Sequence, residues 1–121
     1  MEEKNPVKIL LVDDDIALRE VLKTMLADFT VVEADNGKDA VELYKTVKPD
    51  IVLMDIVMPE KNGIDATREI LELDPNAKIL AITAYAKSKA KEMMDAGAKE
   101  VISKPIKKSE LVQLIMQYVN N

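Results

Sequence analysis

Carboxylates, a hydroxyl and an ammonium follow short apolar segments at four places in the chain. Asp13 and Asp14 follow one such segment, Asp55 a second, Thr83 a third and Lys104 a fourth. Ligands of parallel α/β sheets bind outside the carboxyl ends of the strands, so these groups would meet in one crevice if the strands are parallel. Converging carboxylates repel one another and need a cation nearby. We therefore expect a single site at this end of the sheet.

These residue types suit a magnesium ion and phosphoryl transfer. Mg²⁺ binds hard oxygen ligands, often one or two carboxylates, and retains several waters, which fits Asp13, Asp14 and Asp55. A carboxylate beside the cation, here Asp55, can attack a phosphoryl group and form an acyl phosphate. Thr83 could donate a hydrogen bond to a transferred phosphoryl oxygen, and Lys104 could place its ammonium on the same oxygens. We expect the protein to supply mainly positioning and charge neutralisation.

Five short apolar segments alternate with five segments of helical periodicity, which indicates βαβ units and a mostly parallel sheet. The expected strands are residues 8–12, 30–34, 51–54, 78–82 and 99–103, and the helical stripes are residues 18–26, 40–47, 64–71, 90–97 and 111–118. Several strands are continuous apolar runs, typical of strands covered on both faces. We predict one α/β domain over residues 1–121 without an output domain.

Local signals place caps and core residues within these elements. Asp14 or Asp15 is expected to cap the first helix, and Ser109 the last. Met93 and Met94 are expected to fill the core. Asp55 on its own is expected to cap the turn that follows it, so its chemical role depends on the other carboxylates.

Composition excludes several classes of site. The chain has no Cys and no His, which excludes disulfides, zinc–cysteine sites and imidazole bases, so any phosphohistidine must belong to a partner. The net charge of −5 argues against direct nucleic-acid binding. No apolar run could span a membrane, and residues 1–6 are too polar for a signal peptide. We expect a cytoplasmic protein.

The motifs together resemble the receiver domain of two-component response regulators over nearly the whole chain. They are Ile9–Asp14, Asp50–Asp55, Met58-Pro59, Gly63, Thr83-Ala84 and Lys104-Pro105. Residues 58–66 and 74–78 are especially similar to stand-alone chemotaxis receivers. The resemblance implies a flavodoxin-like, doubly wound, five-stranded parallel sheet of order 2-1-3-4-5 with five helices.

The resemblance also implies roles for the acidic residues. Asp55 would accept a phosphoryl group from a histidine kinase. Asp14 and Asp55 would bind Mg²⁺ directly, Asp13 would bind it through water, and the backbone carbonyl of Val57 would complete the protein ligands.

Thr83 and Lys104 would hold the phosphoryl oxygens in such a receiver, and the Lys104-Pro105 bond is a candidate for the cis form. Phosphorylation would draw Thr83 inward and move the face formed by the fourth helix, fifth strand and fifth helix, where a downstream protein would bind. The family usually has Tyr or Phe three residues before the Lys, but here this position is Val101. The coupling would then be weaker or run through backbone shifts; the favoured alternative is that Val101 is simply a good strand residue.

Two residues beside the phosphate are expected to set its lifetime. Val57 and Tyr85 could partly screen an acyl phosphate from water and slow its hydrolysis. The alternative for Tyr85 is an exposed position on a loop.

Three other functions remain open from the sequence. The chain could be a phosphorelay intermediate or a receiver cut from a larger transcriptional regulator, or a degenerate receiver that only binds partners. A phosphatase of the haloacid-dehalogenase type also uses Asp, Mg²⁺, Thr or Ser, and Lys at strand ends. The sequence disfavours it, because no Asp follows Asp95 and Ala17 stands where Thr or Val is expected. We expect a signalling protein rather than an enzyme.

Overall fold

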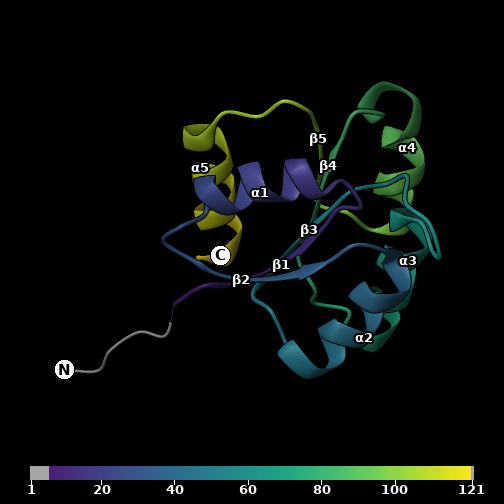
Figure 1. Cartoon of the computed structure of the whole chain (residues 1–121). Helices are drawn as coiled ribbons and strands as arrows, with labels where there is room; N and C mark the ends of the chain where they lie inside the picture. The colour runs from purple at the N-terminus through teal and green to yellow at the C-terminus, as the bar shows by residue number, and fades with distance from the viewer. Residues whose placement is uncertain (1–5, 121) are drawn as a thin grey trace.

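A computed structural model of the protein describes residues 6–120. Within this range five strands alternate with five helices (Figure 1). In chain order they are β1 (Lys8–Val12), α1 (Ile16–Met25), β2 (Thr30–Ala34), α2 (Gly37–Val47), β3 (Ile51–Met54), α3 (Gly63–Leu73), β4 (Ile79–Thr83), α4 (Ala86–Ala96), β5 (Glu100–Ser103) and α5 (Lys108–Val119). All strand pairs are parallel and the order is β2-β1-β3-β4-β5. The expected doubly wound sheet is confirmed.

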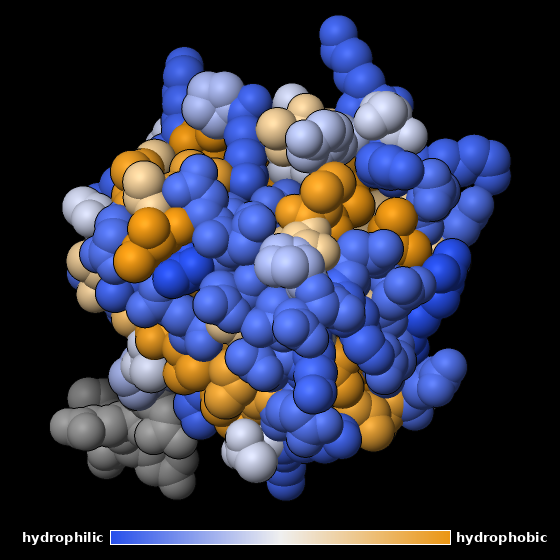
Figure 2. Space-filling model, turned by 45° about the vertical axis from the view of Figure 1, so that its right-hand side comes forward, coloured by the Kyte–Doolittle hydropathy of each residue, from blue (hydrophilic) through white to orange (hydrophobic). Residues whose placement is uncertain are grey.

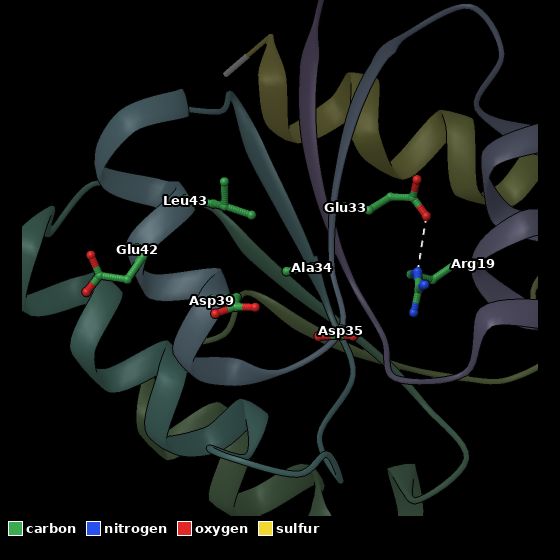
Figure 3. A pocket seen from close by; sticks show the side chains of 7 residues that line it. All are labelled: Arg19, Glu33, Ala34, Asp35, Asp39, Glu42 and Leu43. Carbon is green, nitrogen blue, oxygen red and sulfur yellow. Dashed lines mark hydrogen bonds and ion pairs between the residues drawn. The ribbon is translucent and has the colours of Figure 1, made fainter.

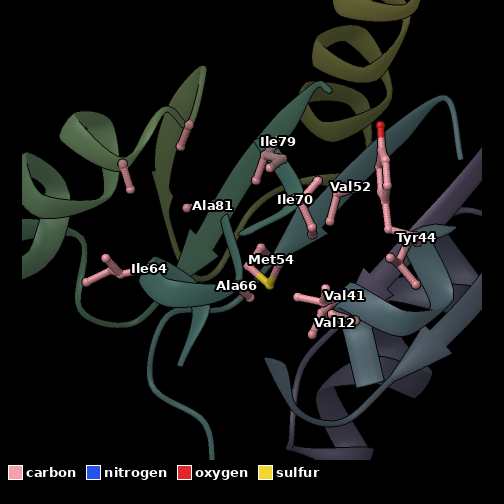
Figure 4. Close-up of a cluster of buried hydrophobic side chains, with 14 of the residues drawn as sticks. Val12, Val41, Tyr44, Val52, Met54, Ile64, Ala66, Ile70, Ile79 and Ala81 are labelled. Atoms are coloured by element: carbon pink, nitrogen blue, oxygen red, sulfur yellow. The ribbon is translucent and has the colours of Figure 1, made fainter. Parts of the chain in front are cut away.

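Two hydrophobic clusters pack on opposite faces of this sheet, because successive side chains of a strand point to opposite sides. Leu10 and Val12 of β1 face the cluster under α2, α3 and α4 (Figure 4). Ile9 and Leu11 face the cluster under α1 and α5. Figure 1 shows the same division, with α1 and α5 on one side of the sheet and α2, α3 and α4 on the other. Both strand faces are covered, which explains the continuous apolar runs.

Side-chain caps begin three helices, and the one at α1 was expected from the sequence. The Asp15 side chain accepts hydrogen bonds from the amides of Ala17 and Leu18 and caps α1. Asn36 and Asn62 cap α2 and α3 in the same manner.

Several local expectations were wrong. α5 begins at Lys108, so Ser109 lies inside its first turn, and the cap residue Lys107 makes no side-chain capping bond. Ile106 and Leu111 are both buried against the sheet, and this packing, rather than a hydroxyl cap, sets the start of the helix. Of the two Met residues in α4 only Met93 is buried, while Met94 is 46% exposed. β4 (Ile79–Thr83) both begins and ends one residue later than expected, and β5 begins one residue later, at Glu100.

The surface is mostly hydrophilic on the face shown in Figure 2, and hydrophobic side chains form small separate groups between charged ones. Within residues 6–120 no helix has the length and apolar character needed to cross a bilayer.

Candidate functional site

The site lies where β1 and β3 end side by side. Val12 pairs with Met54 in the sheet register, so Asp13 and Asp55 are the first residues beyond two neighbouring strands. The Asp55 amide donates to the Val12 carbonyl at 2.9 Å. One carboxylate oxygen from each of Asp13, Asp14 and Asp55 lies within 4.8 Å of the other two. This donor set fits one hard divalent cation, and the convergence expected from the sequence is confirmed.

The three carboxylates differ in their surroundings. Asp13 and Asp55 are buried, while Asp14 is exposed at the rim. Burial raises the pKa of Asp55, and the charge of Asp13 raises it further; Lys104 and the hydrogen bond from the Ile56 amide oppose the shift without cancelling it. The ionised form of Asp55 therefore gains from an added cation.

Lys104 supplies a positive charge within the site. Its Nζ lies 2.8 Å from Oδ2 of Asp13 and 3.3 Å from Oδ2 of Asp55. The Lys104 amide donates to the Thr83 carbonyl, and the Lys104-Pro105 bond is cis, as expected. Burial lowers the pKa of Lys104, but the hydrogen bond to Asp13 and the two carboxylate charges outweigh it and raise the pKa. The sequence suggested phosphoryl oxygens as its partners; the structure pairs it with the two aspartates.

Thr83 is the last residue of β4 and is fully buried. Its Oγ1 accepts a hydrogen bond from the Tyr85 amide at 3.0 Å. Tyr85 occupies the N-cap position of α4, and its side chain is half exposed, as is that of Val57. Val101 lies on β5 opposite Ala81 and packs against the cluster under α4. The Thr83 hydroxyl is thus tied to the start of α4.

Gly63 has a role that sequence reasoning did not assign. Its amide donates to the Ile56 carbonyl at 2.7 Å, and a Cβ at this position would lie 2.0 Å from the Asp55 carbonyl oxygen. The absence of a side chain lets α3 begin directly against Asp55. An Asn-Gly pair is a local turn or cap signal, but the contact of Gly63 with Asp55 depends on the tertiary fold.

Residues 9–116 match the protein family described as "Response regulator receiver domain". The chain belongs to this family.

Similar proteins agree with this assignment. "Chemotaxis protein CheY" of Thermotoga maritima is 47% identical over 89% of this chain and 93% of that protein. The receiver domain of sensor histidine kinase PA1611 from Pseudomonas aeruginosa, with magnesium in its active-site cleft, is 29% identical with a TM-score of 0.91 over 97% of this chain and all of that domain. A CheX-CheY-BeF₃-Mg²⁺ complex from Borrelia burgdorferi contains a chain 33% identical, with a TM-score of 0.85 over 93% of this chain and 88% of that one.

Receiver domains are signalling proteins rather than classical enzymes. They bind Mg²⁺ at an aspartate cluster of this kind and take phosphate from histidine kinases. The phosphatase alternative is therefore disfavoured.

Proposed function

We propose that this receiver is a phosphorylation-dependent switch in which Asp55 accepts a phosphoryl group from a histidine kinase. The observation that carries the proposal is the convergence of the Asp13, Asp14 and Asp55 oxygens within 4.8 Å of one another, beside the Lys104 ammonium. An acceptor, a cation site and a positive side chain are what phosphoryl transfer requires of a protein.

In the transfer step, an Asp55 carboxylate oxygen attacks the phosphorus of the kinase's phosphohistidine. The O–P bond forms as the N–P bond breaks, and the bonding pair returns to the imidazole, which takes up a proton. Mg²⁺, held directly by Asp14, Asp55 and the Val57 carbonyl and through water by Asp13, would neutralise charge on the phosphoryl oxygens. Lys104, now 3.3 Å from Oδ2 of Asp55, would move onto the same oxygens.

The output depends on Thr83. If its hydroxyl turns to a phosphoryl oxygen, it gives up the hydrogen bond from the Tyr85 amide at the start of α4. α4 has no side-chain cap, and it buries only Met93 and Ala96, so its position is open to a small bias. With Val101 in place of an aromatic residue, we propose that this backbone contact carries the change to the α4–β5–α5 face, where a downstream protein binds.

Similarity to chemotaxis proteins over most of the chain supports a role in motility control in the cytoplasm, and the match over residues 9–116 supports a single receiver domain in this sequence. The alternative is a receiver of a phosphorelay or of a larger regulator. Similarity to the receiver domain of a sensor histidine kinase supports this alternative.

We also propose that Val57 and Tyr85 tune the lifetime of the phosphorylated state. Both side chains are about half exposed, Val57 two residues after Asp55 and Tyr85 two residues after Thr83. Partial cover of the acyl phosphate would slow attack by water.

The test is incubation with acetyl phosphate and MgCl₂ followed by intact mass measurement. The wild type should gain one phosphoryl group, and Asp55→Asn should gain none. Labelling of the variant, or no labelling of the folded wild type, would refute the assignment. Turnover of small phosphomonoesters would instead revive the phosphatase reading.

A further inference from the structure

Every polar atom of Asp13 has a partner. Its amide donates to the Ala34 carbonyl at 3.1 Å. Oδ1 accepts from the Asp15 amide at 2.9 Å, and Oδ2 lies 2.8 Å from Nζ of Lys104. Its carbonyl oxygen accepts a hydrogen bond from Nη1 of Arg19 at 2.6 Å. Asp13 is therefore fixed by contacts to both its backbone and its side chain.

Asp14 is in the opposite situation. It is exposed, and within residues 6–120 its carboxylate accepts no hydrogen bond and forms no ion pair. No side-chain contact therefore fixes its direction, and the backbone sets the point and angle at which the side chain leaves the chain. The carbonyl that Arg19 holds belongs to the peptide bond between Asp13 and Asp14, and a planar peptide bond turns as a unit. Fixing that oxygen fixes the plane from which the Asp14 side chain leaves.

Arg19 is itself anchored. It lies on the first turns of α1, its side chain is only 14% exposed, and its Nε donates to Oε1 of Glu33 on β2 at 3.1 Å (Figure 3). Glu33 directly precedes Ala34 in β2, and the Ala34 carbonyl accepts the hydrogen bond from the Asp13 amide. The second oxygen of Glu33 pairs with Lys23 at 3.1 Å. The guanidinium of Arg19, a residue of α1, thus binds both Glu33 on β2 and the peptide bond between Asp13 and Asp14, just after β1.

We propose that Arg19 is a positioning residue of the metal site: held by Glu33, it fixes the Asp13–Asp14 peptide so that Asp14 points at the cation. The inference rests on the proposed function, because it assumes that Mg²⁺ binds at this cluster. Partners of this kind, one step removed from the ligands, typically change metal affinity about 10- to 100-fold when they are lost.

Positioning and simple electrostatics make opposite predictions for this residue. A positive side chain near a cation site repels the cation, so on charge alone its removal strengthens Mg²⁺ binding. If Arg19 acts by holding the peptide, its removal weakens Mg²⁺ binding. Lys23 provides the matched control, because it carries the same charge and pairs with the same Glu33 but does not contact Asp13.

The experiment is calorimetric titration of the whole chain with MgCl₂ at neutral pH and constant ionic strength, for wild type, Arg19→Met, Arg19→Lys and Lys23→Met. Circular dichroism and metal-free Tm report on the fold. Arg19 borders a cavity of about 520 Å³ (Figure 3), which gives shorter side chains room without a clash.

Arg19→Met should raise the Kd for Mg²⁺ about tenfold or more, while Lys23→Met leaves it unchanged or lowers it. Arg19→Lys keeps the charge but loses the planar fork that reaches both partners, so its Kd should rise too. Equal or tighter Mg²⁺ binding by Arg19→Met than by Lys23→Met would overturn the inference. If Arg19→Met does not fold, a wild-type Kd for Arg19→Lys would do the same. A folded wild type that binds no Mg²⁺ would overturn the proposed function itself.

Discussion

Gly63→Ala places a methyl group directly against the backbone of Asp55. Gly63 is the first residue of α3, and the new Cβ would lie 2.0 Å from the Asp55 carbonyl oxygen and 3.0 Å from Cα of Ile56. Carbon and carbonyl oxygen approach to about 3.3 Å at closest in ordinary contacts. The two must therefore separate by roughly 1.3 Å, and the atom in the way is backbone, which no rotamer change can move.

The expected magnitudes follow from this displacement. Ala is normally preferred over Gly inside a helix by about 1 kcal/mol, but overpacking of this kind costs about 1–3 kcal/mol. We expect a net loss that lowers Tm by up to about 10 °C for a domain of this size. A shift of about 1 Å in a reacting group can cost about 100-fold in rate, so phosphorylation of Asp55 should slow by about that factor.

The assay is the initial rate of labelling by acetyl phosphate with saturating MgCl₂, measured at a temperature where the variants are folded. Gly37→Ala is the control, because its Cβ would lie 2.1 Å from another backbone oxygen, that of Lys61, away from Asp55. It should lose similar stability and much less rate. A near-wild-type rate for Gly63→Ala, or equal rate losses in both variants, would refute the reasoning.

Four further outcomes can be measured. Asp55→Asn removes a buried charge whose pKa the fold raises, so by calorimetry its Tm should exceed that of metal-free wild type at pH 7. This advantage should disappear below about pH 4, where the Asp55 carboxyl is protonated in the folded and the unfolded protein. A Tm of Asp55→Asn below that of wild type at pH 7 would contradict the expected destabilisation by the buried charge. Lys104→Met removes the ammonium that pairs with two buried carboxylates. Urea denaturation should show a free energy of unfolding about 2–3 kcal/mol lower, less than for a fully buried pair because the crevice is open to water. MgCl₂ should stabilise this variant more than it stabilises wild type. Tyr44→Phe removes the 2.7 Å hydrogen bond to Asp74 and should cost about 1–2 kcal/mol with an unchanged labelling rate. Tyr85→Ala should speed loss of the phosphoryl group in a mass-based time course; an unchanged rate would remove the screening role.

Strand positions and the identity of the site were predictable from local pattern. Continuous apolar runs ended at Asp13, Asp55 and Thr83, and the parallel topology brings the ends of their strands to one edge of the sheet. The strand order itself came from resemblance to the receiver family, because alternation of strands and helices does not specify which strands are neighbours.

Other features were decided by contacts between distant segments. Met93 and Met94 are adjacent and chemically identical, yet only Met93 faces the sheet. Ser109 is a good capping residue in isolation, but burial of Ile106 and Leu111 starts the helix earlier. Capping preferences are worth about 1 kcal/mol, less than full burial of two large apolar side chains.

The sequence by itself restricted the chemistry open to this protein, because without His and Cys any phosphoryl transfer must use Asp, Ser, Thr, Lys or a metal, and any metal must be held by oxygen atoms. The tertiary structure alone decided how those groups are arranged. It placed the Lys104 ammonium between Asp13 and Asp55, residues that lie 91 and 49 positions away in the chain, and it brought Arg19 to the peptide bond before Asp14. Such contacts depend on which strand ends become neighbours, and electrostatic and hydrogen-bond energies fall off over a few ångströms, so sequence spacing does not encode them.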